Sequence, residues 1–147
     1  MKQGICWLLL AGMFSLAMAA VAEDSDNRTV VRLTPTQRAM VLTEMRQFLA
    51  GLQQITTSLA QDDLERVAAA AQSLGSPMTH HMPADLKQAL PEEFRKLGFS
   101  VHADFDRIAL DAAELGDGGH TLSQLGETLS KCNACHDAYR IEETVSP

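Results

Sequence analysis

Four stretches of this chain repeat apolar residues every three or four positions, and this period constrains the fold more than any other feature. Such spacing places the apolar side chains on one face of a helix. The first stretch follows Thr34 and Pro35, which suit a helix N-cap and the first helical position. The second begins at Asp62 and Asp63 and stops at Gly75. The apolar positions of the first are Leu42, Met45, Leu49, Leu52, Ile55 and Leu59.

The third stretch begins at Pro91, and two glutamates in its first turn suit the helix dipole. The glycine-rich segment 116–119 ends it. Thr121 and Gln124 have the spacing of a capping box, which predicts that the fourth helix begins there and continues to about Ile141. The apolar stripe expected in the third helix consists of Phe94, Val101, Ile108 and Leu115.

The segment between the second and third helices, residues 76–90, contains Pro77 and Pro83. We predict a long connection there, with one helical turn near Asp85. No segment has the convincing pattern of a strand. Four amphipathic helices without strands are typical of a helix bundle. We therefore expect an all-α fold, an up-and-down antiparallel four-helix bundle.

Residues 1–22 have the features of an export signal. Lys2 precedes an apolar run from Ile5 to Leu16, and small residues offer cleavage after about residue 19 or 22. The run is shorter than the roughly 20 apolar residues that cross a bilayer. We expect a soluble periplasmic protein without stable membrane insertion, in which residues 23–147 form a single domain.

The charge of the chain limits its partners. The formal net charge is −7, and it becomes −8 when Lys2 is removed with the signal. Nucleic-acid binding needs a basic surface that neutralises phosphates, so a nucleic-acid partner is excluded. An acidic surface suits a soluble protein, or one that meets a basic partner.

Two of the three cysteines lie close together in the sequence CNACH, as Cys132 and Cys135, directly followed by His136. An exported protein can form disulfides, but a bridge across four residues closes too short a loop to stabilise a fold. Cys-x-x-Cys-His is the signature of covalent haem attachment. The two thiols bond to the vinyl groups of the porphyrin, and the adjacent imidazole binds the iron. The motif predicts one covalent haem c, held by Cys132 and Cys135, with His136 as the proximal iron ligand.

Two other roles remain open for the cysteine pair. A thioredoxin-like redox pair also has the Cys-x-x-Cys spacing, but it belongs to a βαβ context, which the helical pattern does not provide. A structural zinc site needs four ligands. The ligands missing from the motif would have to come from His80, His81, His102 or His120.

The segment CNACHDAYR, on the last of the four expected helices, resembles the cytochrome c′ family and its low-spin relatives. The resemblance is close over residues 131–140. It extends weakly over the mature chain, through the helix order, the LPEEF that opens the third helix and the GD that ends it. It implies a four-helix bundle, frequently a homodimer, with a single haem. It also implies that Arg140 shields the proximal face of the haem; the alternative is an ordinary basic residue at a helix C-terminus.

The residue opposite His136 decides the function of such a protein. In an up-and-down bundle the end of the fourth helix lies beside the start of the first, so this residue is expected within positions 40–45. A methionine ligand raises the potential and suits electron transfer, whereas a leucine leaves the iron open to a small gas. We favour Met45 as the distal iron ligand because it lies on the apolar stripe, where a methionine can also be ordinary core. The other candidates are Leu42, Met40 and His102.

These features predict a periplasmic mono-haem c-type cytochrome that carries single electrons between redox partner proteins. We do not expect an enzyme, because the sequence has no evident acid–base pair, nucleophile constellation or phosphate loop. The alternative is a five-coordinate, cytochrome c′-like protein that binds a gas such as nitric oxide. A third possibility is a redox or metal module without haem.

The segment SPMTHHMP, residues 76–83, places two methionines and two histidines in the long connection. Thioether and imidazole ligands together suit copper. The alternative is a loop whose side chains pack near the haem end of the bundle.

Overall fold

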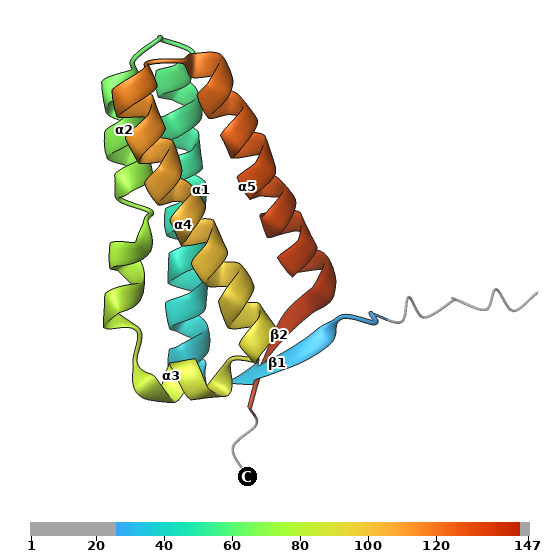
Figure 1. The fold of residues 1–147 in the computed structure, drawn as a ribbon. Coiled ribbons are helices and arrows are strands. Elements are labelled where there is room, and N and C mark those ends of the chain that lie inside the picture. The colour runs from blue at the N-terminus through green and yellow to red at the C-terminus, as the bar shows by residue number, and fades with distance from the viewer. Residues whose placement is uncertain (1–25, 145–147) are drawn as a thin grey trace, which may run out of the picture.

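The chain is all-α in class, as expected. The structure is a computed structural model that describes residues 26–144 (Figure 1). The predicted signal peptide, residues 1–22, lies outside the described residues. Between residues 26 and 144, no helix is long and apolar enough to cross a membrane. The elements are β1 (Thr29–Leu33), α1 (Pro35–Leu59), α2 (Leu64–Gln72), the 3₁₀-helix η1 (Ser76–His81), α3 (Ala84–Ala89), α4 (Glu92–Leu115), α5 (Gly118–Ala138) and β2 (Tyr139–Glu143).

The starts of α1 and α2 fold as their capping residues predict. Thr34 caps α1: its hydroxyl accepts a hydrogen bond from the Gln37 backbone N–H, and the Gln37 side chain accepts one from the Thr34 N–H. This reciprocal capping box satisfies two donors that a helix N-terminus leaves free. The Gln37 amide also donates to Asp85 of α3 (3.0 Å). Asp63 caps α2 by accepting from the Arg66 N–H.

The start of α5 corrects the predicted capping box at Thr121 and Gln124. Gly116 ends α4 in the left-handed region (φ 61°), and Asp117 then accepts hydrogen bonds from the N–H groups of the two residues that follow Gly118. The helix therefore begins one turn earlier than expected, because Asp117 is an equally good cap and comes first in the chain. Thr121 instead donates to the Asp117 carbonyl, and Gln124 donates to a side chain of α4.

The two ends of the described chain form a parallel two-stranded sheet that the sequence pattern does not predict. Strand β1 pairs with β2, with Thr29 opposite Tyr139 and Leu33 opposite Glu143. The last helix therefore ends at Ala138 and does not continue to Ile141. The strand pair has a structural reason: Tyr139 and Ile141 pack against a buried apolar cluster, and Tyr139 meets the ring of Phe94 edge-on at a centroid distance of 5.3 Å.

The connection between α2 and α4 contains the predicted helical turn near Asp85, as α3, and a second helical piece, η1. Asp106 of α4 holds the start of η1: its carboxylate accepts hydrogen bonds from the backbone N–H of Ser76 (3.0 and 3.2 Å) and from its hydroxyl (2.5 Å). The Thr79 hydroxyl then donates to the Ser76 carbonyl (2.8 Å). This connection is therefore an ordered segment anchored to α4.

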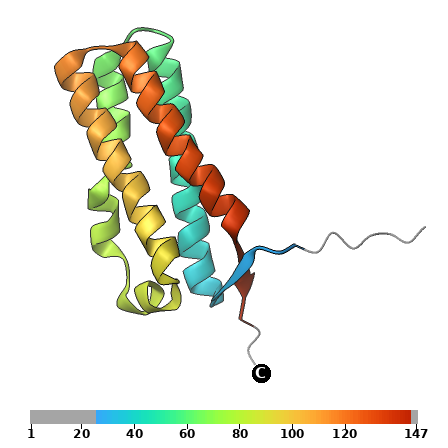
Figure 2. The same ribbon diagram turned by 45° about the vertical axis from the view of Figure 1, so that its right-hand side comes forward.

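The helices enclose two separate apolar clusters. α2 packs against α1 and α4, and α5 packs against α4. Figures 1 and 2 show α1 and α4 running in one direction and α2 and α5 in the other. The first cluster fills the end near the α4–α5 turn and includes Ile55, Phe105 and Ile108. The second lies at the opposite end, where β1, β2 and α3 meet, and includes Leu33 and Leu86.

Replacing Gly51 by alanine should lower the free energy of unfolding by about 1–3 kcal/mol, because the new methyl group overpacks a filled interior. A Cβ at Gly51 of α1 would lie 2.4 Å from Leu74 Cδ1 and 2.8 Å from its Cγ. The matched control is Gly126→Ala on α5, where no atom lies within 4 Å of the added Cβ. That change should leave stability equal or raise it by up to about 1 kcal/mol. Denaturant unfolding followed by circular dichroism measures both; equal effects would contradict the close packing of α1 on the end of α2.

Candidate functional site

A cavity lies where α1, α4 and α5 meet, between the two apolar clusters. It holds about 730 Å³ of space not filled by atoms, part of it open to solvent. Its wall is mostly apolar, with few polar side chains. The lining residues are Val41, Glu44, Met45 and Phe48 of α1, Met82, Leu86 and Leu90 of the connection, Phe94, Arg95, Leu97, Gly98, Phe99, Val101 and His102 of α4, and Cys132, Cys135 and His136 of α5.

α5 brings its three motif residues to this cavity together. Cys135 and His136 follow Cys132 by three and four positions, so a helix places all three on one face. All three line the cavity. The two cysteines are partly buried and His136 is exposed. The helix therefore presents two thiols and an imidazole to one apolar space.

Both cysteines are free thiols, and their surroundings keep them protonated. Burial raises the pKa of Cys132, and the nearby carboxylate of Asp104 raises it further. Burial also raises the pKa of Cys135, with a smaller contribution from Cys132. The pair lies in the last turns of α5, where the negative end of the helix dipole opposes a thiolate. Reactive redox cysteines have a lowered pKa, so this environment does not suit a thioredoxin-like pair.

The described residues do not assemble the alternative sites considered for this motif. Within residues 26–144, no group of three or more histidine, cysteine, aspartate or glutamate side chains could hold a metal ion together. The parallel strands β1 and β2 lie at the two ends of the described chain, and all the helices come between them. This connection differs from the single crossover helix of a βαβ unit.

Met45 is the candidate distal residue that reaches the cavity and has a free donor atom. It is partly buried on α1 and lines the same space as His136. Met40 is exposed and lines a different groove, and Leu42 is not among the residues of the cavity wall. His102 lines the cavity, but both of its ring nitrogens are engaged elsewhere.

His102 is a buried histidine that joins three helices. Its Nδ1 lies 2.7 Å from the Leu74 carbonyl at the end of α2, and its Nε2 lies 2.9 Å from Glu44 Oε1 on α1. The ring of Phe48 packs on it at a centroid distance of 5.0 Å. Both contacts are acceptors, and an imidazolium can donate to both at once. Burial favours the neutral ring, but the hydrogen bonds to Glu44 and Leu74 and the nearby carboxylates outweigh it, so the pKa of His102 is raised.

Because the pKa of His102 is raised, the stability of the fold should decrease as the pH rises through neutrality. A raised folded-state pKa contributes stability that is complete below the unfolded value of about 6.5 and is lost as the pH passes the folded value. We expect the free energy of unfolding to fall between pH 6 and pH 8. In Glu44→Gln, which keeps a hydrogen-bonding oxygen but removes the charge, this fall should be smaller. Denaturant unfolding of the parent and of Glu44→Gln at both pH values tests this. If stability fell equally in the two proteins, the contact between His102 and Glu44 would not be the source of the pH dependence.

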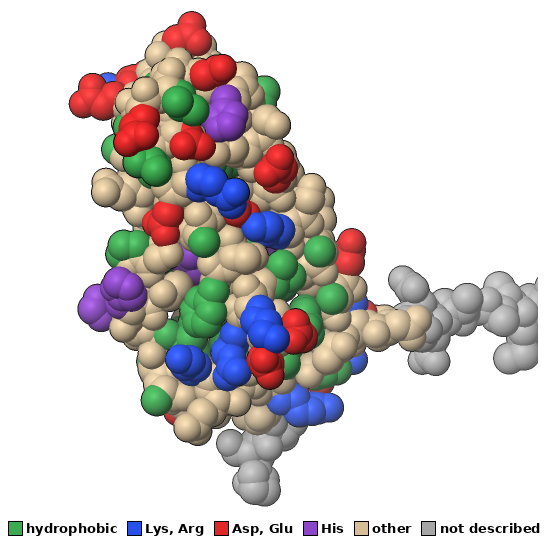
Figure 3. Space-filling view, in the orientation of Figure 1, with side chains coloured by type: hydrophobic (Ala, Val, Ile, Leu, Met, Phe, Trp, Pro, Cys, Tyr) green, Lys and Arg blue, Asp and Glu red, His purple; other side chains and the backbone are tan. Residues whose placement is uncertain are grey.

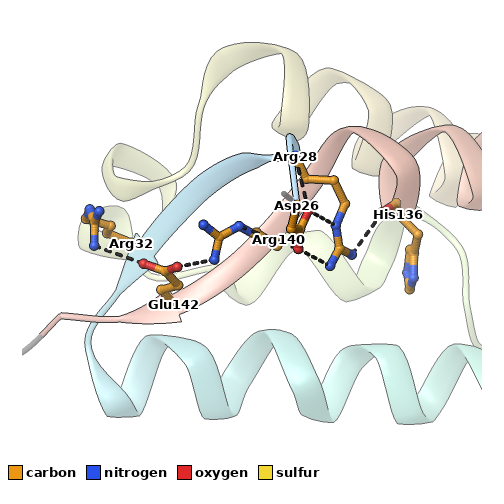
Figure 4. Close-up of polar contacts among 6 residues, drawn as sticks. All are labelled: Asp26, Arg28, Arg32, His136, Arg140 and Glu142. Atoms are coloured by element: carbon orange, nitrogen blue, oxygen red, sulfur yellow. Dashed lines mark hydrogen bonds and ion pairs between the residues drawn. The ribbon is translucent and has the colours of Figure 1, made fainter. Parts of the chain in front are cut away.

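Arg140 does not lie on the last helix, where the sequence pattern predicted it. It lies on β2 and not on the helix, it pairs with Glu142, and its Nε lies 3.7 Å from Asp26 Oδ2. It is not among the residues of the cavity wall. In Figure 4 the imidazole of His136 points away from this group of charged residues. The reason is the early end of α5, which turns the chain into the strand before Arg140 is reached.

Arg28, and not Arg140, is the arginine that contacts the motif, and no pattern in the sequence predicts this contact. Its Nη1 donates to the backbone carbonyl of His136 (3.3 Å), while Asp26 holds its Nε and Nη2 at 2.9 and 2.7 Å (Figure 4). The last carbonyls of a helix have no partner within it, so Arg28 satisfies one of them and places a positive charge at the negative end of α5. No local signal could have indicated a contact across 108 positions.

A buried carboxylate fixes α5 to α4 beside the first cysteine. Asp104 is 5% exposed and forms ion pairs with Arg107 on its own helix and with Lys131 Nζ (2.5 Å) on α5. Lys131 directly precedes Cys132. Removal of one partner from a buried ion pair is costly because it leaves a charge uncompensated, so this contact holds the motif at a defined height along α4.

Charged side chains of both signs lie on the surface of this acidic chain. In Figure 3 lysine and arginine side chains are prominent in the lower half of the face shown, and acidic side chains gather near the top. Arg95 lines the cavity and donates to the Lys87 carbonyl. Lys96 pairs with Glu92 and Glu93 at 2.8 and 2.9 Å. The wall of the cavity therefore includes charged side chains of both signs, Arg95 and Glu44.

The site thus combines two protonated thiols, an exposed imidazole and a thioether around one apolar space. Comparison of the chain with protein-family models, curated proteins and solved structures finds no match. Its chemistry can be assessed from its donor set. The thiols can form covalent bonds to a planar apolar group, and His136 and Met45 offer the nitrogen and sulfur ligands that haem iron takes in cytochromes c.

Proposed function

We propose that this protein is a periplasmic mono-haem c-type cytochrome of the cytochrome c′ type that carries single electrons. The proposal is supported chiefly by one observation: Cys132, Cys135, His136 and Met45 line the same apolar cavity. The first three come from adjacent turns of α5, and Met45 comes from α1, 87 positions earlier in the chain. If the motif occurred by chance, there would be no reason to expect a methionine from a distant part of the chain and an apolar space beside it.

The residues present fit a covalent haem. Cys132 and Cys135 would hold it through thioether bonds, and His136 and Met45 would be its proximal and distal ligands. Phe48, Phe94 and the other apolar side chains of the wall would exclude water and keep the dielectric constant low. When bound there, the haem supplies a one-electron couple whose potential is raised by a thioether ligand.

The arrangement of the helices agrees with the proposed architecture, an up-and-down antiparallel four-helix bundle. The three packed pairs are α1 with α2, α2 with α4 and α4 with α5. Their directions alternate in Figures 1 and 2. Ligand and cofactor sites of such bundles are built from side chains on facing helices, which is where the motif and Met45 lie.

The surface beside the cavity indicates the kind of redox partner. Charged groups at a docking surface steer encounters and select partners by complementarity. Arg95 and Glu44 both line the cavity, so a partner that docks there would have to present a group of opposite charge to each. We propose an electron carrier and not an enzyme.

The test is to produce the full chain in bacterial cells that mature c-type cytochromes and to weigh the product. We expect the mass of the processed polypeptide plus one haem, retained after denaturation, and a reversible one-electron couple in voltammetry. A colourless product with the mass of the bare polypeptide would overturn the proposal. A covalent haem without a reversible couple would retain the cofactor but remove the electron-carrier function.

A further inference from the structure

A second group of soft ligands lies in a groove between α1 and η1 that borders the candidate cavity, and Met82 lines both spaces. Met40 of α1, Met78 and His81 of η1, and Met82 directly after it all line this groove. Met40 and His81 are exposed, whereas Met78 and Met82 are partly buried. Three methionines and one histidine therefore border the same groove.

The 3₁₀ geometry of η1 explains why two of these residues lie on the same face of the helix. With three residues per turn, side chains at i and i+3 lie one above the other, so Met78 and His81 share a face. His80 is one position away from that face and does not line the groove. Side chains on a regular, anchored segment are more precisely placed than those on an unsupported loop.

Two further contacts fix the two ends of η1. Asp106 holds the N-terminus of η1, and the Met82 N–H donates to the Thr79 carbonyl (3.2 Å) at its end. Met78 packs against the first apolar cluster and Met82 against the second. The stems of both methionines are thus held by the interior while the groove has access to solvent.

We propose that Met40, Met78, His81 and Met82 form a binding site for a soft monovalent metal ion, Cu(I). Thioether sulfur is a soft donor that selects Cu(I), and imidazole is a ligand common to copper sites. All four ligands are neutral when the histidine is deprotonated, which suits a singly charged ion. Zn²⁺ prefers thiolate, imidazole or carboxylate ligands and finds only one of these among the four. Met82 also lines the candidate cavity, but metal binding here needs no haem, so its test is independent of the proposed electron-carrier function.

The experiment measures metal bound by the purified full chain. The protein, with any free thiols blocked by N-ethylmaleimide, is dialysed to equilibrium against Ag(I), a redox-inert substitute for Cu(I), and separately against Zn²⁺. Bound metal is then determined by atomic emission. We expect one Ag(I) per chain and little Zn²⁺. Cu(I), supplied anaerobically with ascorbate, should compete for the same site.

Matched variants locate the site. Met→Leu changes nearly preserve volume and are well tolerated, so Met40→Leu, Met78→Leu and Met82→Leu should fold. Each of these, and His81→Asn, should weaken Ag(I) binding by about tenfold or more, since loss of even an outer-shell partner costs roughly that. The control His80→Asn should bind as the parent does. The proposal is overturned if Ag(I) does not bind, if the variant lacking all four ligands binds equally well, or if His80→Asn loses as much affinity as His81→Asn.

Discussion

If the proposed covalent haem is present, replacing Cys132 and Cys135 together by alanine should abolish its attachment. The two thiols are the groups that could bond to the porphyrin on the wall of the cavity, and no other cysteine lies within residues 26–144. We expect the purified variant to show the mass of the bare polypeptide after denaturation. Any residual haem would be held by His136 and apolar contacts alone, and acid–organic extraction would remove it. Mass spectrometry and a haem stain on a denaturing gel measure this directly.

The control for this experiment lies inside the motif. Asn133 is exposed between the two cysteines, so Asn133→Ala keeps both thiols and the helix and should retain the full haem content. The double variant should keep its helical circular dichroism in the apo form, because Cys132 only borders the first apolar cluster. A covalent haem in the double alanine variant would refute the assignment of the motif. A loss of haem in Asn133→Ala to the same extent would show that local folding, and not thioether chemistry, decides attachment.

The parts of the fold that the sequence predicted are those with short-range signals. Helix α1 begins where Thr34 and Pro35 indicate, and α4 ends at Gly116, because capping residues act within a single turn. The sheet was missed because its strands lie about 110 residues apart and each has only five residues. The β-branched run from Thr29 to Val31 was the available signal, but it has no turn and partner nearby to indicate pairing.

Misplaced boundaries had consequences for the site. Asp117 and Thr121 are both acceptable caps, and the sequence pattern could not show that the left-handed Gly116 places Asp117 at the helix start. At the other end, Tyr139 leaves the helix because its ring packs against Phe94. This tertiary contact overrides the helical continuation, and it moves Arg140 onto a strand and away from the cavity.

The residues of the candidate site were predictable to different degrees. The positions of Cys132, Cys135 and His136 on one helix face follow from their spacing alone. The placement of Met45 followed from the apolar stripe and from the expected height of the motif along the helices. The contacts of His102 were beyond prediction, because one of its partners is the free carbonyl at the end of another helix. That contact removes it from the candidate ligands.

In the proposed cytochrome, replacing Met45 by leucine should convert a six-coordinate haem to an open site. Leucine has nearly the same volume as methionine, so the cavity wall is preserved while the sulfur donor is removed. We expect loss of the weak far-red sulfur-to-iron band in the ferric spectrum and rapid binding of carbon monoxide to the reduced protein. The potential should fall by on the order of 0.1 V, a fraction of the roughly 0.8 V that axial ligation spans. Absorption spectra with and without carbon monoxide, together with voltammetry, measure these changes.

Met40→Leu provides the comparison, because Met40 lies on the same helix but lines the neighbouring groove. Its spectrum and potential should equal those of the parent protein. If Met45→Leu left the far-red band unchanged, Met45 would not be the ligand, and loss of the band in Met40→Leu would assign the role to Met40 and require α1 to rotate. If the parent protein itself lacked the band and bound carbon monoxide readily, the iron would already be open. The apolar side chains around Met45, among them Val41 and Phe48, would then line a gas pocket, and the protein would be a gas-binding relative of the electron carriers.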